Sequence, residues 1–144
     1  MKTISSLALF LFSMHAAAQQ DFSKFKWRNR ILLFSVESLN DESFTAHFKS
    51  FMDNQKKLED RNLLIFTLVK GRIYDKDLKP VSHYDIASLR KKYDIAGNFT
   101  GVVLIGKDGV TKLKKNFPVE PRVIFETIDQ MPMRQKEMRE NIDD

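Results

Sequence analysis

The chain has 144 residues, 42% hydrophobic and 30% charged, and its 24 basic against 19 acidic residues give a formal net charge of +5. That length suits one compact domain with its own core. Cysteine is absent, which excludes disulfides, thiolate catalysis and cysteine metal clusters, and only His15, His47 and His83 are available for a zinc site or a catalytic triad.

The first 18 residues have the features of a cleavable signal peptide. Lys2 gives a positive start, residues 4–12 are mostly apolar, and residues 16–18 are alanines of the kind that signal peptidase accepts. The apolar stretch is far shorter than the ~20 residues that span a bilayer. We therefore predict cleavage after Ala18, a mature chain of residues 19–144 with no transmembrane segment, and a protein that is secreted or periplasmic.

The first half of the mature chain predicts a strand, a helix and a second strand. Residues 19–26 are polar and expected to be frayed. Trp27 is expected to be buried at the start of the first strand, with exposure toward a partner as the alternative. Residues 31–36 and 63–69 are continuous apolar runs, typical of strands covered on both faces. Between them, Asn40 or Asp41 caps a helix whose apolar residues recur at helical spacing: Phe44, Phe48, Phe51, Met52 and Leu58.

A second helix and a β-hairpin follow. Ser82 and Asp85 resemble a capping box that opens the helix, and the Gly97-Asn98 pair ends it. Residues 102–105 form a third apolar strand, and Asp108-Gly109 is a turn signal that leads into a returning strand over residues 110–115. Lys112 and Lys114 share one face of that returning strand, which suits the edge of a sheet.

The last predicted element is a helix that begins at Pro121, is interrupted by Pro132, and resumes over residues 133–140. The order is therefore β-α-β-α-β-β-α, an α/β single domain. Strands that alternate with helices imply parallel pairing in a covered sheet, with one antiparallel hairpin at the end. This is the thioredoxin-like arrangement.

Three segments resemble one particular family, the domain of unknown function 4174: residues 27–33, 103–109 and 128–138. The resemblance covers about residues 24–139. It implies a thioredoxin- or peroxiredoxin-like fold in an exported protein, since the family occurs in small exported bacterial proteins and in animal extracellular-matrix proteins with sushi repeats. It implies no established reaction.

Two departures from true thioredoxins exclude a thiol oxidoreductase. Residues 35–43, where a redox cysteine pair (CxxC) would lie, contain no cysteine, and Phe99 stands where the cis-proline would be. The leading interpretation is therefore a binding or structural module of the cell envelope or extracellular space. It has no catalytic residue, cofactor or metal.

The contact residues predicted for this module are Lys107, Lys112, Lys114 and Arg134, which would attract an envelope or matrix protein or an acidic polymer. Nucleic acid is not an expected partner of an exported protein. The alternative interpretation is a cysteine-independent enzyme that uses Glu37 and Asp41 in the loop after the first strand, where helix capping is the competing explanation.

A remote alternative is cuprous ion binding by methionines. Met131, Met133 and Met138 lie within eight positions, and thioethers suit a soft metal. The competing explanation is that these side chains pack a kinked helix onto the sheet. No histidine or cysteine is nearby to complete a metal site.

Overall fold

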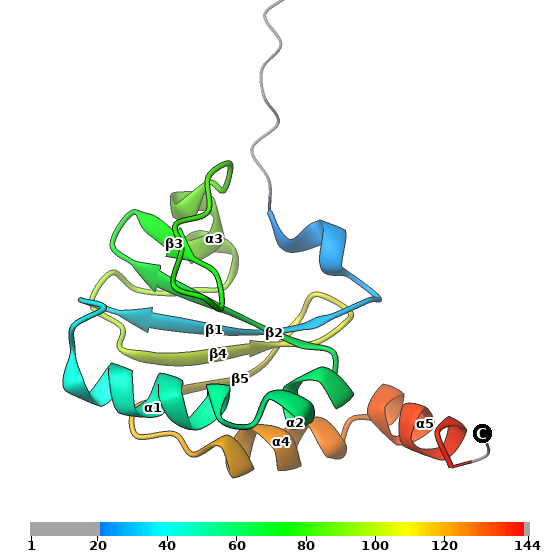
Figure 1. Ribbon diagram of the computed structural model, residues 1–144. Coiled ribbons are helices and arrows are strands. Elements are labelled where there is room, and N and C mark those ends of the chain that lie inside the picture. The colour runs from blue at the N-terminus through cyan, green and yellow to red at the C-terminus, as the bar shows by residue number, and fades with distance from the viewer. Residues whose placement is uncertain (1–20, 143–144) are drawn as a thin grey trace, which may run out of the picture.

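The computed structural model describes residues 21–142, so the predicted signal peptide and its cleavage after Ala18 lie outside the described residues. Helices cover both faces of a five-stranded sheet, whose strand order is β3-β2-β1-β4-β5 (Figure 1). The strands are β1 (Arg30–Val36), β2 (Leu63–Val69), β3 (Arg72–Tyr74), β4 (Gly101–Ile105) and β5 (Thr111–Asn116). The helices are η1 (Phe22–Phe25, a 3₁₀ turn), α1 (Glu42–Met52), α2 (Gln55–Asp60), α3 (Ile86–Lys92), α4 (Pro121–Asp129) and α5 (Pro132–Glu140).

The pairing of the strands differs from the expected one at two points, the direction of β4 and the presence of β3. The apolar strands β1 and β2 pair in parallel as predicted, but β4 is antiparallel to β1. The additional strand β3 runs antiparallel to β2, and α3 follows it. As a result, β4 begins at the end of the sheet at which β1 ends, and Gly101 lies opposite Ser35. β5 lies at the edge of the sheet, as the spacing of its lysines predicts.

The sheet lies between two apolar layers, one on each face. β1 and β4 are buried along their whole length because both of their faces are covered. Beneath the sheet lie α1, α2 and α4, and above it lie η1 and α3 (Figure 1). Phe34 is 0% exposed at the centre of the lower layer. Its ring contacts four others at centroid distances of 5.6–6.0 Å: Phe44, Phe48, Phe51 and Phe117.

Two predictions near the N-terminus are wrong. Residues 22–25 form a helical turn rather than a frayed segment, because Phe22 is 4% exposed and packs 5.2 Å from the ring of Phe66. Trp27 is 62% exposed rather than buried. It follows η1 with a φ of 65°, and Nζ of Lys26 lies 5.5 Å from its ring.

The start of α3 is also displaced from its predicted position. Asp85, not Ser82, is the N-cap, and it accepts hydrogen bonds from the backbone N and Oγ of Ser88 at 3.1 and 2.6 Å. These bonds hold the pKa of Asp85 below its ordinary value. Asp41 is the N-cap of α1, one of the two residues that the sequence offered.

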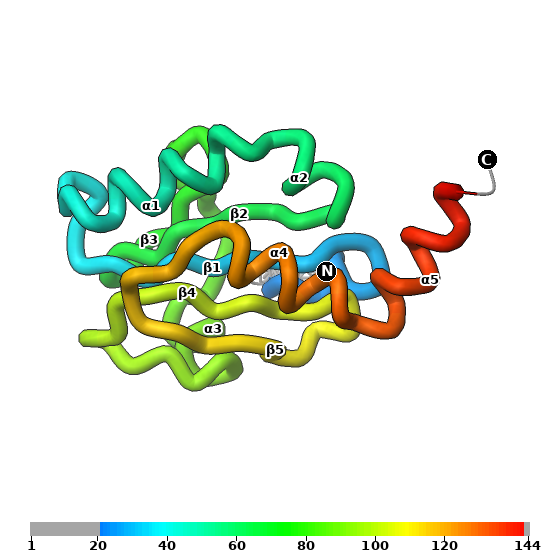
Figure 2. The backbone as a smooth tube through the Cα atoms, turned by 90° about the horizontal axis from the view of Figure 1, so that it is seen from below, coloured from blue at the N-terminus to red at the C-terminus, as the bar shows by residue number. Residues whose placement is uncertain are grey.

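The chain breaks at Pro132 as predicted, and α5 then extends beyond the end of the sheet at which β1 begins (Figures 1 and 2). Arg134 is the only residue of α5 that is buried among those the structure describes. The helix is therefore held by polar contacts rather than by an apolar face. None of the helices in residues 21–142 has the length and apolar character needed to cross a membrane.

Candidate functional site

The predicted acidic loop, with Glu37 and Asp41, lies at the end of the sheet at which β1 ends. Oδ1 of Asp41 accepts a hydrogen bond from the backbone N of Phe44 at 2.8 Å, and the carbonyl of Asp41 accepts one from Oγ1 of Thr45 at 2.9 Å. Asp41 therefore has a structural role at the N-terminus of α1, while Glu37 is exposed just beyond β1. Within residues 21–142, no three histidine, cysteine or acidic side chains are grouped so that they could hold a metal ion.

A polar cross-link lies at the end of β1, next to the segment in which the resemblance to thioredoxins would place a redox cysteine pair. Oγ of Ser35, at the end of β1, donates to the carbonyl of Phe99 at 2.9 Å. Arg90 from α3 donates to the carbonyls of Ala96 and Lys70 at 3.3 and 3.1 Å, and burial lowers its pKa. The peptide bond between Phe117 and Pro118 is cis, but it follows β5 and does not precede β4. This cluster joins the ends of β1 and β2 to α3 and to the loop before β4, and the chain has no cysteine thiol.

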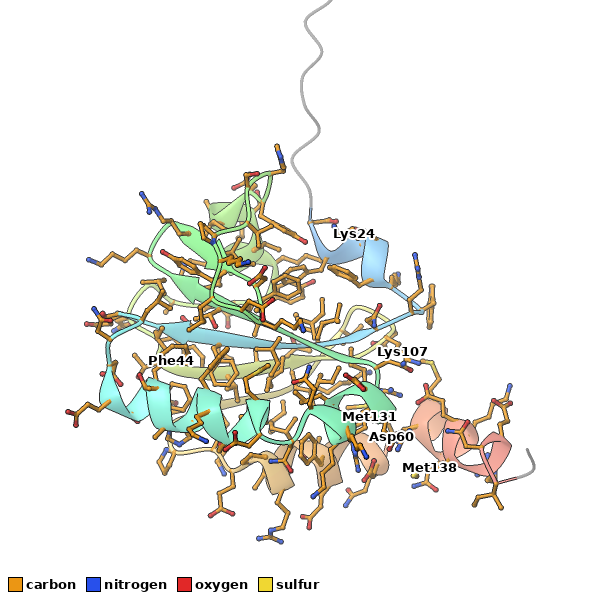
Figure 3. All side chains as sticks on the ribbon, in the orientation of Figure 1. Lys24, Phe44, Asp60, Lys107, Met131 and Met138 are labelled. Carbon is orange, nitrogen blue, oxygen red and sulfur yellow. The ribbon has the colours of Figure 1, made fainter. Side chains whose placement is uncertain are left out.

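The opposite end of the sheet contains a network of ion pairs that joins α5 to β1 and to the β4–β5 hairpin. Arg30 is 1% exposed, and its Nη1 and Nη2 donate to the two carboxylate oxygens of Glu137 at 3.1 and 3.2 Å. Nζ of Lys107 donates to Oε1 of Glu137 at 2.6 Å and to Oδ1 of Asn62 at 2.9 Å. Lys107, labelled in Figure 3, thus bridges the hairpin and α5.

Arg134 is the centre of the second half of this network. Its Nη2 lies 2.5 Å from Oδ2 of Asp60, its Nε lies 3.2 Å from Oδ1 of Asp129, and its Nη1 donates to the carbonyl of Asp60 at 2.8 Å. Arg61 reaches the same Asp129 at 2.7 Å. Since Arg134 is 3% exposed, it cross-links α2, α4 and α5 inside the protein.

The carboxylates of the network are stabilised in their charged form. Burial raises the pKa of Glu137, but hydrogen bonds from Arg30 and Lys107 lower it by more, so that the pKa is below its ordinary value. Burial likewise raises the pKa of Asp129, and the bonds from Arg61 and Arg134 outweigh it. Both groups are therefore ionised at neutral pH and remain paired with the surrounding cations.

A pocket of about 490 Å³ lies beside the network, between the hairpin and the junction of α4 with α5. Arg30, Lys107 and Lys112 line its basic side, and Met131, Pro132 and Met133 line its apolar side. Nζ of Lys112 is 2.7 Å from Oδ2 of Asp108, which also lines the pocket. Lys107 and Lys112 are thus the two predicted contact residues that the structure brings together.

The other two predicted contact residues lie elsewhere. Arg134 is behind the pocket wall, in the network. Nζ of Lys114 lies 3.8 Å from Oδ2 of Asp94 and 5.2 Å from the centre of the Phe99 ring, on the α3 side of β5. The four basic residues therefore do not form a single surface.

Exposed apolar side chains surround the same hairpin. Trp27, Val110 and Met133 are 62%, 56% and 39% exposed. The backbone N of Trp27 donates to the carbonyl of Lys107 at 2.6 Å, and Met133 lines the pocket together with Lys107. We call Trp27, Lys107, Val110, Lys112 and Met133 the hairpin face.

From the sequence, burial of Trp27 is favoured over exposure toward a partner, so its place on this face is not predicted. Its charged neighbours Lys26 and Arg28 are the local signal that could have indicated exposure. The three clustered methionines also separate: Met131 packs against the lower core, while Met138 lies farther out along α5 (Figure 3).

Comparisons with known proteins agree with the fold. The family model described as "Domain of unknown function (DUF4174)" matches residues 21–137. The chain is similar to the reduced 2-Cys peroxiredoxin of Plasmodium vivax, with 16% identity, a TM-score of 0.59, and coverage of 78% of this chain and 83% of that one. It is also similar to thioredoxin peroxidase I of Plasmodium yoelii, with 17% identity, a TM-score of 0.55, and coverage of 79% of each chain. No curated protein matches the sequence. At these identities the structures show the fold alone, and both the thioredoxin-like α/β class and the family expected from the sequence are confirmed.

Proposed function

Since the chain belongs to the family described as Domain of unknown function (DUF4174), we propose that it is an exported thioredoxin-like binding module rather than a thiol enzyme. The observation that carries the proposal is a fold shared with peroxiredoxins in a chain that has no cysteine. Without a thiol, this chain cannot reduce peroxide or exchange disulfides through a cysteine of its own. The signal peptide predicted from the sequence would direct it to the periplasm or the extracellular space.

The hairpin face is the proposed contact surface. Exposed tryptophan and methionine side chains near the cations of one hairpin have the composition of protein-binding surfaces. Trp27 is 62% exposed although its backbone is fixed to the hairpin, so it is presented to solvent at a defined place. Lys112 adds a partly exposed positive charge, which favours an acidic protein or polymer of the envelope or matrix.

The enzyme alternative receives less support. Asp41 already accepts the capping bond of α1, so that Glu37 has no free acidic partner in that pair. A copper site would need Met131, Met133 and Met138 to converge, whereas Met131 and Met133 line the pocket and Met138 does not.

The test is a quantitative affinity capture from envelope or matrix extract, with residues 19–144 as bait. A Trp27→Ala, Lys112→Glu variant is compared with Lys115→Glu, which reverses the charge of an exposed lysine on β5 outside the hairpin face. We expect an acidic partner that is captured by the wild type and by Lys115→Glu, released at 1 M salt, where the Debye length is about 3 Å, and lost from the double variant. An empty capture, or equal capture by both variants, would contradict the proposal.

A further inference from the structure

The end of the sheet beside α5 carries one more positive than negative charge in its ion-pair network. Among the described residues, its cations are Arg30, Arg61, Lys107 and Arg134, and its carboxylates are Asp60, Asp129 and Glu137. Lys112 and Asp108 form a separate pair and leave this balance unchanged. An unbalanced charge beside side chains as buried as Arg30 and Arg134 is unfavourable, and one added anion would neutralise it.

Arg30 also has an unused donor. Its Nη1 and Nη2 are bound to Glu137 and to the carbonyl of Arg61, but its Nε is buried and has no acceptor in the part of the chain that the structure describes. A buried donor without a partner is rare in folded proteins and costs stability. Arg30 is 1% exposed and is one of the residues that line the pocket, so a side chain with an unpaired donor takes part in the cavity wall.

The same pocket has an apolar side. Met131, Pro132 and Met133 follow one another at the junction of α4 with α5. Thr127 of α4 and Gln130, the C-cap of that helix, add two polar groups. Methionine side chains adapt to the shape of an apolar ligand. The volume of about 490 Å³ lies within the range of roughly 300–1,000 Å³ that is typical of small-molecule sites.

We propose that this pocket binds a small amphipathic carboxylate, with its acid group at Lys107 and Lys112 and its carbon chain along Met131 and Met133. A single excess charge matches a monoanion such as a carboxylate better than a phosphate, which carries nearly two charges. The apolar wall requires a chain as well as an acid group. The proposal goes beyond a macromolecular partner of the hairpin face, because the ligand enters the cavity itself.

The test is a calorimetric and NMR titration of residues 19–144 with decanoate, below the concentration at which it forms micelles. Decanol has the chain without the charge, and acetate has the charge without the chain. We expect saturable binding of decanoate at one site, with shift changes centred on Gly106, Lys107 and Met133, and at least tenfold weaker binding of the other two probes. The absence of saturable decanoate binding, or equal binding of decanol or acetate, would overturn the proposal.

Two lysines of β5 make a matched pair of variants. The side chains of Lys112 and Lys114 are both 33% exposed, but only Lys112 lines the pocket. We expect Lys112→Ala to weaken decanoate binding about fivefold, which corresponds to about 1 kcal/mol, and Lys114→Ala to leave it unchanged. Met133→Gln, at a 39% exposed site, should weaken decanoate binding without changing the weak binding of acetate. Equal effects of the two lysine variants would refute the assignment to this pocket, even if the affinity capture had succeeded.

Discussion

Replacing Glu137 with glutamine is predicted to lower the free energy of unfolding by about 2 kcal/mol at pH 7. Glu137 accepts a bidentate pair from Arg30 at 3.1 and 3.2 Å and a third bond from Lys107 at 2.6 Å. Removing one partner of a fully buried ion pair costs about 3–5 kcal/mol. The Glu137 side chain is 22% exposed and glutamine keeps one acceptor oxygen, so the expected loss is about 2 kcal/mol.

The loss should depend on pH in a defined direction. Burial raises the pKa of Glu137, but the bonds from Arg30 and Lys107 lower it by more, to a value below the ordinary 4.5. A carboxylate with a lowered pKa stabilises the folded state above its unfolded pKa, and this contribution is lost as pH falls through the folded pKa. The difference between the wild type and Glu137→Gln should therefore be constant above about pH 5 and shrink as the pH falls below 4.

The assay is urea unfolding followed by circular dichroism from pH 7 to pH 3, with amide exchange of residues 132–140 to detect release of α5 alone. The matched control is Glu140→Gln, which removes a carboxylate from the same helix, where Glu140 is 64% exposed and pairs with Lys136 at 3.7 Å. We expect this variant to change the free energy of unfolding by less than about 0.5 kcal/mol. The reasoning is refuted if both variants lose the same stability and protection of α5, or if the Glu137→Gln deficit grows in acid.

Three further predictions follow from the same contacts. Asp41→Ala removes the N-cap of α1 and should lower the free energy of unfolding in urea by about 1 kcal/mol. An unchanged urea midpoint would argue against a capping role of Asp41. Arg134→Met removes one of the two arginines that pair with Asp60 and Asp129, the other being Arg61, and should cost about 2–3 kcal/mol. At equal folded fraction, partner capture by this variant should match that by the wild type, since the Arg134 side chain is 3% exposed. Phe34→Ala opens the centre of the lower core and should lower the free energy of unfolding by about 3–5 kcal/mol, and a loss below about 1 kcal/mol would contradict its central position.

The elements that the sequence predicts best are those with a strong local pattern. The apolar runs locate β1, β2 and β4, Asp108-Gly109 locates the hairpin, and Pro132 locates the break between α4 and α5. β3 has only three residues, too few for a periodic signal, and its omission is the reason that the third apolar strand was given the wrong direction.

The site was less predictable because its contacts are distant in sequence. Arg30 and Glu137 are 107 positions apart, and nothing in either neighbourhood indicates that they meet. Arg134 lies in a polar helix, where a cation is ordinarily exposed, and only the packing of α5 against α2 and α4 buries it. That Lys107 and Lys112 lie close together could be predicted because both flank the hairpin turn, which is visible in the sequence.

The two ends of the sheet differ in what they leave free for binding. A helix N-terminus stabilises an anion, and it is the setting in which a cysteine thiol acquires a low pKa and becomes reactive. In this chain the N-terminus of α1 carries the carboxylates of Asp41 and Glu42 instead, so its dipole stabilises the helix and activates no nucleophile. At the other end, the network that holds α5 has one more positive than negative charge, and an apolar cavity lies beside it. Unmatched charge and exposed apolar surface are features that a ligand satisfies, so we locate binding at the end with α5 rather than at the end where peroxiredoxin-like chemistry would require a thiol.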